Sequence, residues 1–187
     1  KKPDKVDETI DLKNQFVIPP LGDAHTHNLD GIFNLEQTIN NYLQEGTFYV
    51  QVLGNYAQGA IEAKPFLNKP SAIDAIYANA MLTCTYGHPF MVYEPLAMGI
   101  YNPSEARQKI SEAKKSRKAE NRAYIFFDSK SDVDAKWEKY LAGKPDIVKI
   151  ALLDAENYEK YYAEGNTVDK GLSPEVAEYV VQKSHQA

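Results

Sequence analysis

Short apolar runs alternate with helical patterns along the whole of this 187-residue chain. Such alternation is typical of α/β architecture, in which helices cross between parallel strands. The sequence therefore predicts an α/β fold with a parallel sheet and about four βα units. Strands are expected at 16–25, 47–53, 72–83, 124–127 and 147–153; helices at 34–46, 57–68, 104–120 and 131–142, with a last one opening at 173; and a long loop at 85–103.

Two histidines stand two residues apart at the end of the first expected strand. Because side chains alternate between the faces of a strand, His25 and His27 should point to the same side, a few ångströms apart. Two imidazoles in this arrangement suit a divalent transition metal, preferably zinc. The sequence therefore predicts that His25 and His27 are metal ligands. The alternative is a pair of surface or hydrogen-bonded histidines.

The segment Val17-Ile18-Pro19-Pro20-Leu21-Gly22-Asp23-Ala24-His25-Thr26-His27 resembles the first-strand signature of the amidohydrolase superfamily of metal-dependent hydrolases. That signature is an apolar pair, Pro-Gly, two further residues and then Asp-x-His-x-His. Pro20 stands where glycine is common, and Gly22 where an aliphatic residue is common. Gly87-His88-Pro89 and residues 144–150 continue the resemblance in the same order.

The resemblance implies a TIM-type (β/α)8 barrel. A complete barrel needs about 250 residues, which is more than this chain has. Residues 16–187 are therefore expected to form the N-terminal half of such a barrel, as a fragment of it. Residues 1–15 would be the return segment from a small β domain that flanks the barrel.

The resemblance also implies a mechanism. A metal-bound hydroxide would attack an amide, peptide or cyclic-amide carbonyl. Lys149, carbamylated by carbon dioxide, would join His25 and His27 as a ligand and bridge two divalent ions, which the resemblance implies are zinc. The aspartate that acts as general acid and base is expected outside this chain, so the chain alone is expected to be inactive. Alternatively, Lys149 reaches water or pairs with Asp128 or Asp154.

Three residues are predicted to contact the substrate. His88 lies in the long loop, and Asn55 and Tyr56 follow the second strand. Loops beyond strand ends often carry such contacts, although a structural, hydrogen-bonded role is the alternative for His88. Cys84 has no base near it in sequence, so a buried and inert thiol is expected.

The composition limits the partners. A net charge of −5 argues against nucleic acid, and no apolar run approaches the roughly 18 residues of a membrane span. A small-molecule or peptide substrate is expected, together with the remainder of the barrel or another copy of the chain. Nothing in the sequence assigns a compartment.

Two other readings remain open. The chain could be a non-catalytic metal-binding or assembly module that pairs with another chain or with itself. It could also be a small α/β protein whose histidines are structural.

Overall fold

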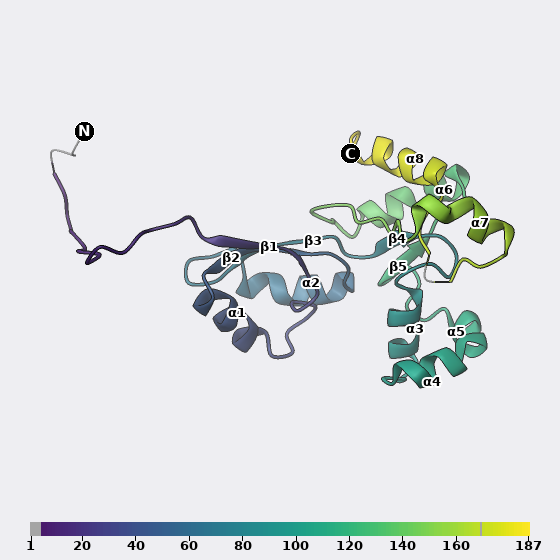
Figure 1. Ribbon diagram of the computed structural model, residues 1–187, viewed down its shortest axis with the longest axis horizontal. Helices are drawn as coiled ribbons and strands as arrows, with labels where there is room; N and C mark the ends of the chain where they lie inside the picture. The colour runs from purple at the N-terminus through teal and green to yellow at the C-terminus, as the bar shows by residue number, and fades with distance from the viewer. Residues whose placement is uncertain (1–4, 169) are drawn as a thin grey trace.

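The computed structural model describes residues 5–168 and 170–187. Parallel strands alternate with helices (Figure 1), which confirms the predicted α/β class. In chain order the elements are β1 (Leu21–Thr26), α1 (Leu35–Gln44), β2 (Thr47–Val52), α2 (Ala57–Ala63), η1 (Lys64–Phe66), β3 (Asp74–Tyr77), β4 (Met81–Thr83), α3 (Phe90–Ala97), α4 (Pro103–Gln108), α5 (Ile110–Ser116), β5 (Tyr124–Phe126), α6 (Lys130–Leu141), η2 (Ala155–Asn157), α7 (Tyr158–Ala163) and α8 (Pro174–Ser184).

Among the described residues, no helix combines the length and apolarity needed to cross a bilayer.

The strands form two small parallel sheets. The first has the order β1-β2-β3, and the second pairs β4 with β5. Leu82 of β4 also forms a parallel bridge with Ile150, so β4 lies between β5 and the segment around Ile150. The described residues form no closed barrel.

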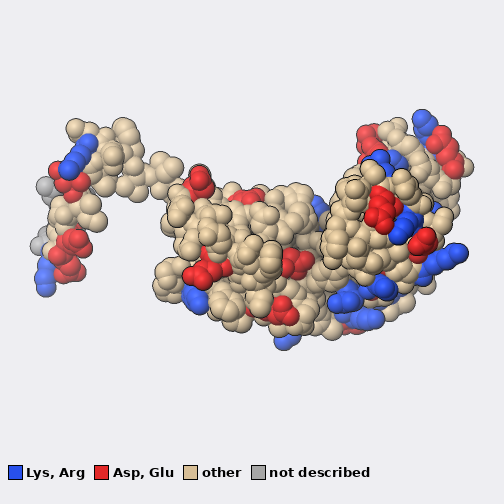
Figure 2. Space-filling model, turned by 90° about the horizontal axis from the view of Figure 1, so that it is seen from below, with Lys and Arg blue, Asp and Glu red and all other residues tan. Residues whose placement is uncertain are grey.

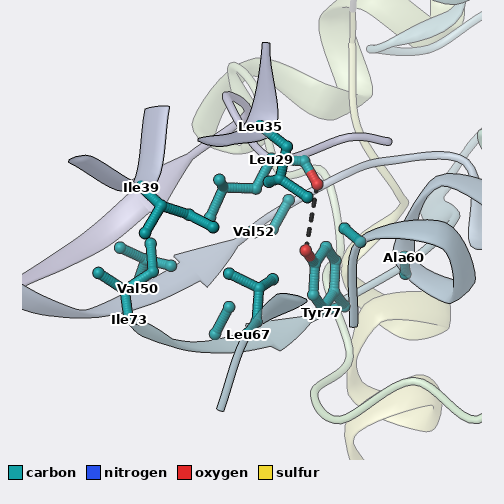
Figure 3. Packing of buried hydrophobic residues seen from close by; sticks show 11 residues of the cluster. Leu29, Leu35, Ile39, Val50, Val52, Ala60, Leu67, Ile73 and Tyr77 are labelled. Atoms are coloured by element: carbon teal, nitrogen blue, oxygen red, sulfur yellow. Dashed lines mark hydrogen bonds between the residues drawn. The ribbon is translucent and has the colours of Figure 1, made fainter. Parts of the chain in front are cut away.

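Within the described part of the chain, the first sheet is covered on one face only. Helices α1 and α2 lie against that face (Figure 1), and Figure 3 shows the aliphatic side chains packed between them and the strands. Tyr77 extends this core, and its hydroxyl donates to the carbonyl of Leu29 at 3.1 Å. The opposite face carries Tyr49, Gln51 and Ile76, which are exposed, Tyr49 at 53% and Ile76 at 37%.

The second sheet is covered on both faces. Ile125 packs toward Trp137 of α6 and Val180 of α8. Its neighbours in β5, Tyr124 and Phe126, point the other way, toward Phe90 of α3 and the helix α5. This alternation follows the two-residue period of a strand.

A fully buried carboxylate ties α3 to the connection that precedes β5. Glu94 is 0% exposed. Its oxygens accept the N–H groups of Lys118 at 2.6 Å and Ala119 at 3.0 Å, and the hydroxyl of Tyr124 at 2.5 Å. Burial alone would raise the pKa of Glu94, but hydrogen bonds to the carboxylate, these among them, outweigh burial and hold it below its usual range.

The first predicted strand begins later than expected. Residues 5–20 form neither helix nor strand and extend away from the sheet (Figure 1). Phe16 is 94% exposed, and strand pairing begins only where Leu21 meets Thr47. An apolar run becomes a strand only where a neighbouring strand pairs with it. Pro19 and Pro20 also lack the N–H groups that such pairing uses. Residues 1–4 of the predicted return segment lie outside the described residues.

The predicted helix over 104–120 is wrong in its continuity. It divides into α4 and α5 at Lys109, and Asn102 caps α4 by accepting the N–H of Ser104 at 2.8 Å. Lys109 and Glu105 form an ion pair at 3.0 Å. The predicted loop 85–103 is also wrong in part, because it contains α3.

Near the C-terminus, the strand expected over 147–153 is reduced to the single bridge at Ile150. The helices η2 and α7 follow it and were not predicted. The last helix begins as predicted, since Ser173 caps α8 by accepting the N–H of Val176 and Pro174 occupies its first turn.

Candidate functional site

The two histidines lie side by side at the C-terminal end of β1. Their ring centroids are 5.3 Å apart, with the ring planes at 60°. Thr26, between them in sequence, is buried and hydrogen-bonded to the hydroxyl of Tyr42 in α1 at 2.7 Å. Thr26 therefore faces α1 while both imidazoles are exposed, in the arrangement that the i, i+2 spacing predicts.

An irregularity in β1 sets the direction of the motif's aspartate. Asp23 pairs with Val50 and Thr26 with Val52, so β1 spans one residue more than β2 over this interval. A bulge of this kind redirects side chains. Asp23 consequently reaches the α1 side, where it accepts from Tyr42 at 3.0 Å, and its other oxygen accepts the N–H of His25 at 3.0 Å. Asp23 thus fixes the backbone that carries His25.

A backbone carbonyl orients the ring of His27. Nδ1 of His27 lies 3.0 Å from the carbonyl oxygen of Gly54. A carbonyl only accepts, so Nδ1 carries the hydrogen, and in the neutral ring Nε2 then has the free lone pair. Metal-binding histidines are commonly oriented in this way. The hydroxyl of Tyr93 donates to the same carbonyl at 2.8 Å and helps to fix it.

Gly54 makes this approach possible. Its φ of +127° is rarely adopted by other residues, and an added Cβ would lie 3.3 Å from Cε1 of His27 and 3.3 Å from Cε of Met81.

Lys149 acts electrostatically on His25. Partial desolvation, the positive charge of Lys149 and the neighbouring His27 together lower the pKa of His25, and Asp23 opposes them. Neither of the carboxylates expected as alternative partners forms an ion pair with Lys149. Asp154 pairs with Lys170 at 2.7 Å, and Asp128 accepts from Thr85.

The histidine pair is half of a typical zinc ligand set. Among the described residues, no third His, Cys, Asp or Glu joins it to form a metal-binding group. Asp30 lies within electrostatic range of His27: burial raises the pKa of Asp30, whereas the N–H of Tyr56 and the charge of His27 lower it. Asp30, Gly54 and Tyr93 were not predicted from the sequence.

The structure places the three predicted substrate contacts in different settings. Asn55 is completely buried, and its side chain bonds to Asn79 and to the carbonyl of Tyr56. Tyr56 is half-buried, with its ring edge-to-face against Tyr93 at 5.4 Å. His88 is partly buried, and its N–H donates to the carbonyl of Lys170 at 2.8 Å. Asn55 thus has a structural role, and substrate contact by the three stays a prediction.

Cys84 matches the expectation of an inert thiol. It is buried at the end of β4, where desolvation and the charge of Asp128 raise its pKa to about 11.

No family model, curated protein or solved structure matches this chain. The geometry of the residues and the resemblance of the Asp23–His27 motif therefore carry the functional argument.

Proposed function

We propose that this chain supplies part of the metal site of an amidohydrolase-type, metal-dependent hydrolase. Its sheets would then be parts of a (β/α)8 barrel that further strands complete. The observation that carries the proposal is the histidine pair, with ring centroids 5.3 Å apart and the Nδ1 of His27 held by the carbonyl of Gly54.

The donor set fits two positions around a zinc ion. Zinc prefers four ligands in a tetrahedron, and neutral imidazole is among its commonest ligands. His25 and His27 would occupy two of these positions. The remaining ligands would come from Lys149 and from residues outside this chain.

Lys149 would need to change charge to serve as a ligand. An ammonium repels a metal ion. The neutral amine, however, can attack carbon dioxide, which forms an N–C bond and releases a proton. The product is a carbamate anion, which reverses the charge beside His25 and adds two oxygen donors. The electrostatic effect of Lys149 on the pKa of His25 supports its nearness to the pair.

A bound divalent ion would polarise the scissile carbonyl of an amide, peptide or cyclic amide and favour deprotonation of water. The chain's own residues hold the site in place: Gly54 and Tyr93 orient His27, and Asp23 holds the backbone of His25. Tyr56 and His88 are proposed to contact the substrate. The general acid and base is proposed to lie outside this chain.

The proposal predicts metal binding without turnover. Zinc titrated into the purified chain should bind at one site per chain, seen by calorimetry and by metal content after desalting. The same sample should not hydrolyse a panel of dipeptides and cyclic amides, since the general acid is absent. Failure to retain zinc would contradict the site, whereas zinc-dependent turnover of about 1–1000 per second would show that the chain is a complete enzyme.

One observation favours an assembly module instead. The uncovered face of the first sheet, with Tyr49 and Ile76, is apolar and lines a depression of about 260 Å³. Monomeric proteins seldom leave a sheet face of this kind unpacked. Pairing with another copy of the chain would cover it. A native mass of twice the 21.0 kDa of one chain, reduced to a single chain's mass by Tyr49→Ser, would support this function.

A further inference from the structure

A small cavity lined by positive charge lies beside the second sheet. Its volume is about 70 Å³, and it lies between the residues that precede β4 and β5 and the helix α6. Three cations, Arg122, Lys136 and Lys139, contribute to its lining. None of the described residues that line it is an aspartate or glutamate, and neither histidine of the candidate metal site is among them.

The cations are not neutralised within the protein. Arg122, Lys136 and Lys139 form no ion pair with any described carboxylate. The ammonium of Lys136 donates to the carbonyl of Phe126 at 2.7 Å, and the guanidinium of Arg122 lies over the ring of Tyr56 at 5.3 Å. These contacts hold Lys136 and Arg122 in position but do not neutralise their charge. Like charges around one cavity repel one another, and an anion bound there would offset that repulsion.

Neutral groups complete the lining. Asn79 is 5% exposed, and its side-chain Nδ2 donates to the carbonyl of Gly143 at 2.9 Å. That bond uses one lone pair of the carbonyl and so weakens its repulsion of an anion. Asn121 also lines the cavity.

The surroundings extend the positive potential. A second, more open depression of about 390 Å³ shares Arg122 and is also lined by Lys118 and Tyr56. Figure 2 shows Lys and Arg side chains, interspersed with Asp and Glu, at the end of the molecule that carries the second sheet and its helices. Lys118 and Arg122 make the surroundings of the cavity locally positive despite the net charge of −5.

We propose that this cavity binds a phosphate group, either as the free ion or as the head of a small phosphate ester. The volume exceeds twice the share of one liquid water, about 30 Å³, which is room for a group of a few heavy atoms. Arg122 supplies the planar fork that matches two phosphate oxygens, and the lysines supply point charges. The open depression beside Arg122 leaves space for the rest of an ester.

The test is a titration of the full chain with inorganic phosphate, followed by amide NMR at constant ionic strength with chloride as the replaced anion. Saturable binding in the range of about 1 mM is expected, with shifts at Arg122 and Asn79. Arg122→Gln and Lys139→Gln should each weaken binding about tenfold, since each removes a charge-assisted hydrogen bond. A parallel titration with glycerol 3-phosphate separates the two forms: tighter binding indicates an ester, and equal binding indicates the free ion.

Lys115→Gln is the matched control, because it removes the same charge from an exposed position outside the cavity. It should change the affinity by less than about twofold. All three substitutions are at exposed residues, so circular dichroism should show unchanged folding. Three results would overturn the proposal. They are shifts that do not saturate with phosphate, equal losses of phosphate affinity in the control and both cavity variants, and unchanged phosphate affinity in both cavity variants.

Discussion

A variant in which asparagine replaces both His25 and His27 is expected to lose zinc binding completely. The pair supplies the imidazole donors of the proposed site, and no third described group replaces them. Both rings are exposed, so the free energy of unfolding without metal should change by less than about 0.5 kcal/mol. Calorimetric titration with zinc and urea unfolding measure the two quantities separately.

The control for this variant is His185→Asn. His185 is exposed at the end of α8, so this change removes one of the four histidines and should leave zinc affinity unaltered. Equal loss in this control would indicate nonspecific binding by surface histidines, and retained zinc in the double variant would place the metal elsewhere.

Gly54→Ala separates the orientation of His27 from its presence. The added Cβ would approach Cε1 of His27 at 3.3 Å, so the ring should turn away from the carbonyl that holds Nδ1. Loss of such an outer contact weakens metal binding by about 10–100-fold in known sites. Gly165→Ala is the matched control, because Gly165 also has a positive φ, +65°, but no atom lies within 4 Å of its added Cβ. Equal zinc affinity in the two variants would contradict the orienting role.

The site was predictable where it depended on local periodicity. His25 and His27 share a face because strand side chains alternate, whatever the strand packs against. The directions of Asp23 and His27 depend instead on a bulge opposite β2 and on the carbonyl of Gly54, which is 27 residues from His27. Neither contact leaves a signal in the local sequence.

The pairing of strands is likewise not determined by the local sequence. The run 147–153 is apolar enough for a full strand, yet only Ile150 finds a partner, and that partner is Leu82, not β5. Hydrophobicity predicts that a segment will be extended, but its pairing depends on which edge is free after the rest of the chain has packed. The position of Lys149 relative to His25 could therefore be expected from the resemblance but not from the pattern.

Helix α3 illustrates tertiary packing overriding local preference. Pro95 lies within it, and Gly87, Pro89 and Gly99 flank it, all of which favour a loop. Burial of Phe90 in the core and the bonds of Glu94 stabilise the helix in spite of them. The opposite occurs at Lys109, where a favourable ion pair with Glu105 does not prevent a break between α4 and α5.

Glu94→Gln is expected to destabilise the fold by about 2–4 kcal/mol at neutral pH. The carboxylate accepts two N–H groups and one hydroxyl in a fully buried position. An amide of the same size turns an NH2 donor toward one of these donors, so at least one is left without an acceptor. Urea unfolding measures the loss, and Glu112→Gln, an exposed change on α5, should stay within about 0.5 kcal/mol of the original protein.

The pH dependence of this difference tests the charge itself. The pKa of Glu94 is lowered in the folded state, so the folded protein binds the proton more weakly than the unfolded chain. The stabilisation is therefore fully present above the unfolded pKa of about 4.3 and is lost as pH falls through the lower folded pKa. The difference in the free energy of unfolding between the original protein and Glu94→Gln should accordingly be largest near neutral pH and become smaller in acid. A gap that stays constant down to about pH 3 would show that the shape of the side chain, and not its ionisation, stabilises the junction between α3 and β5.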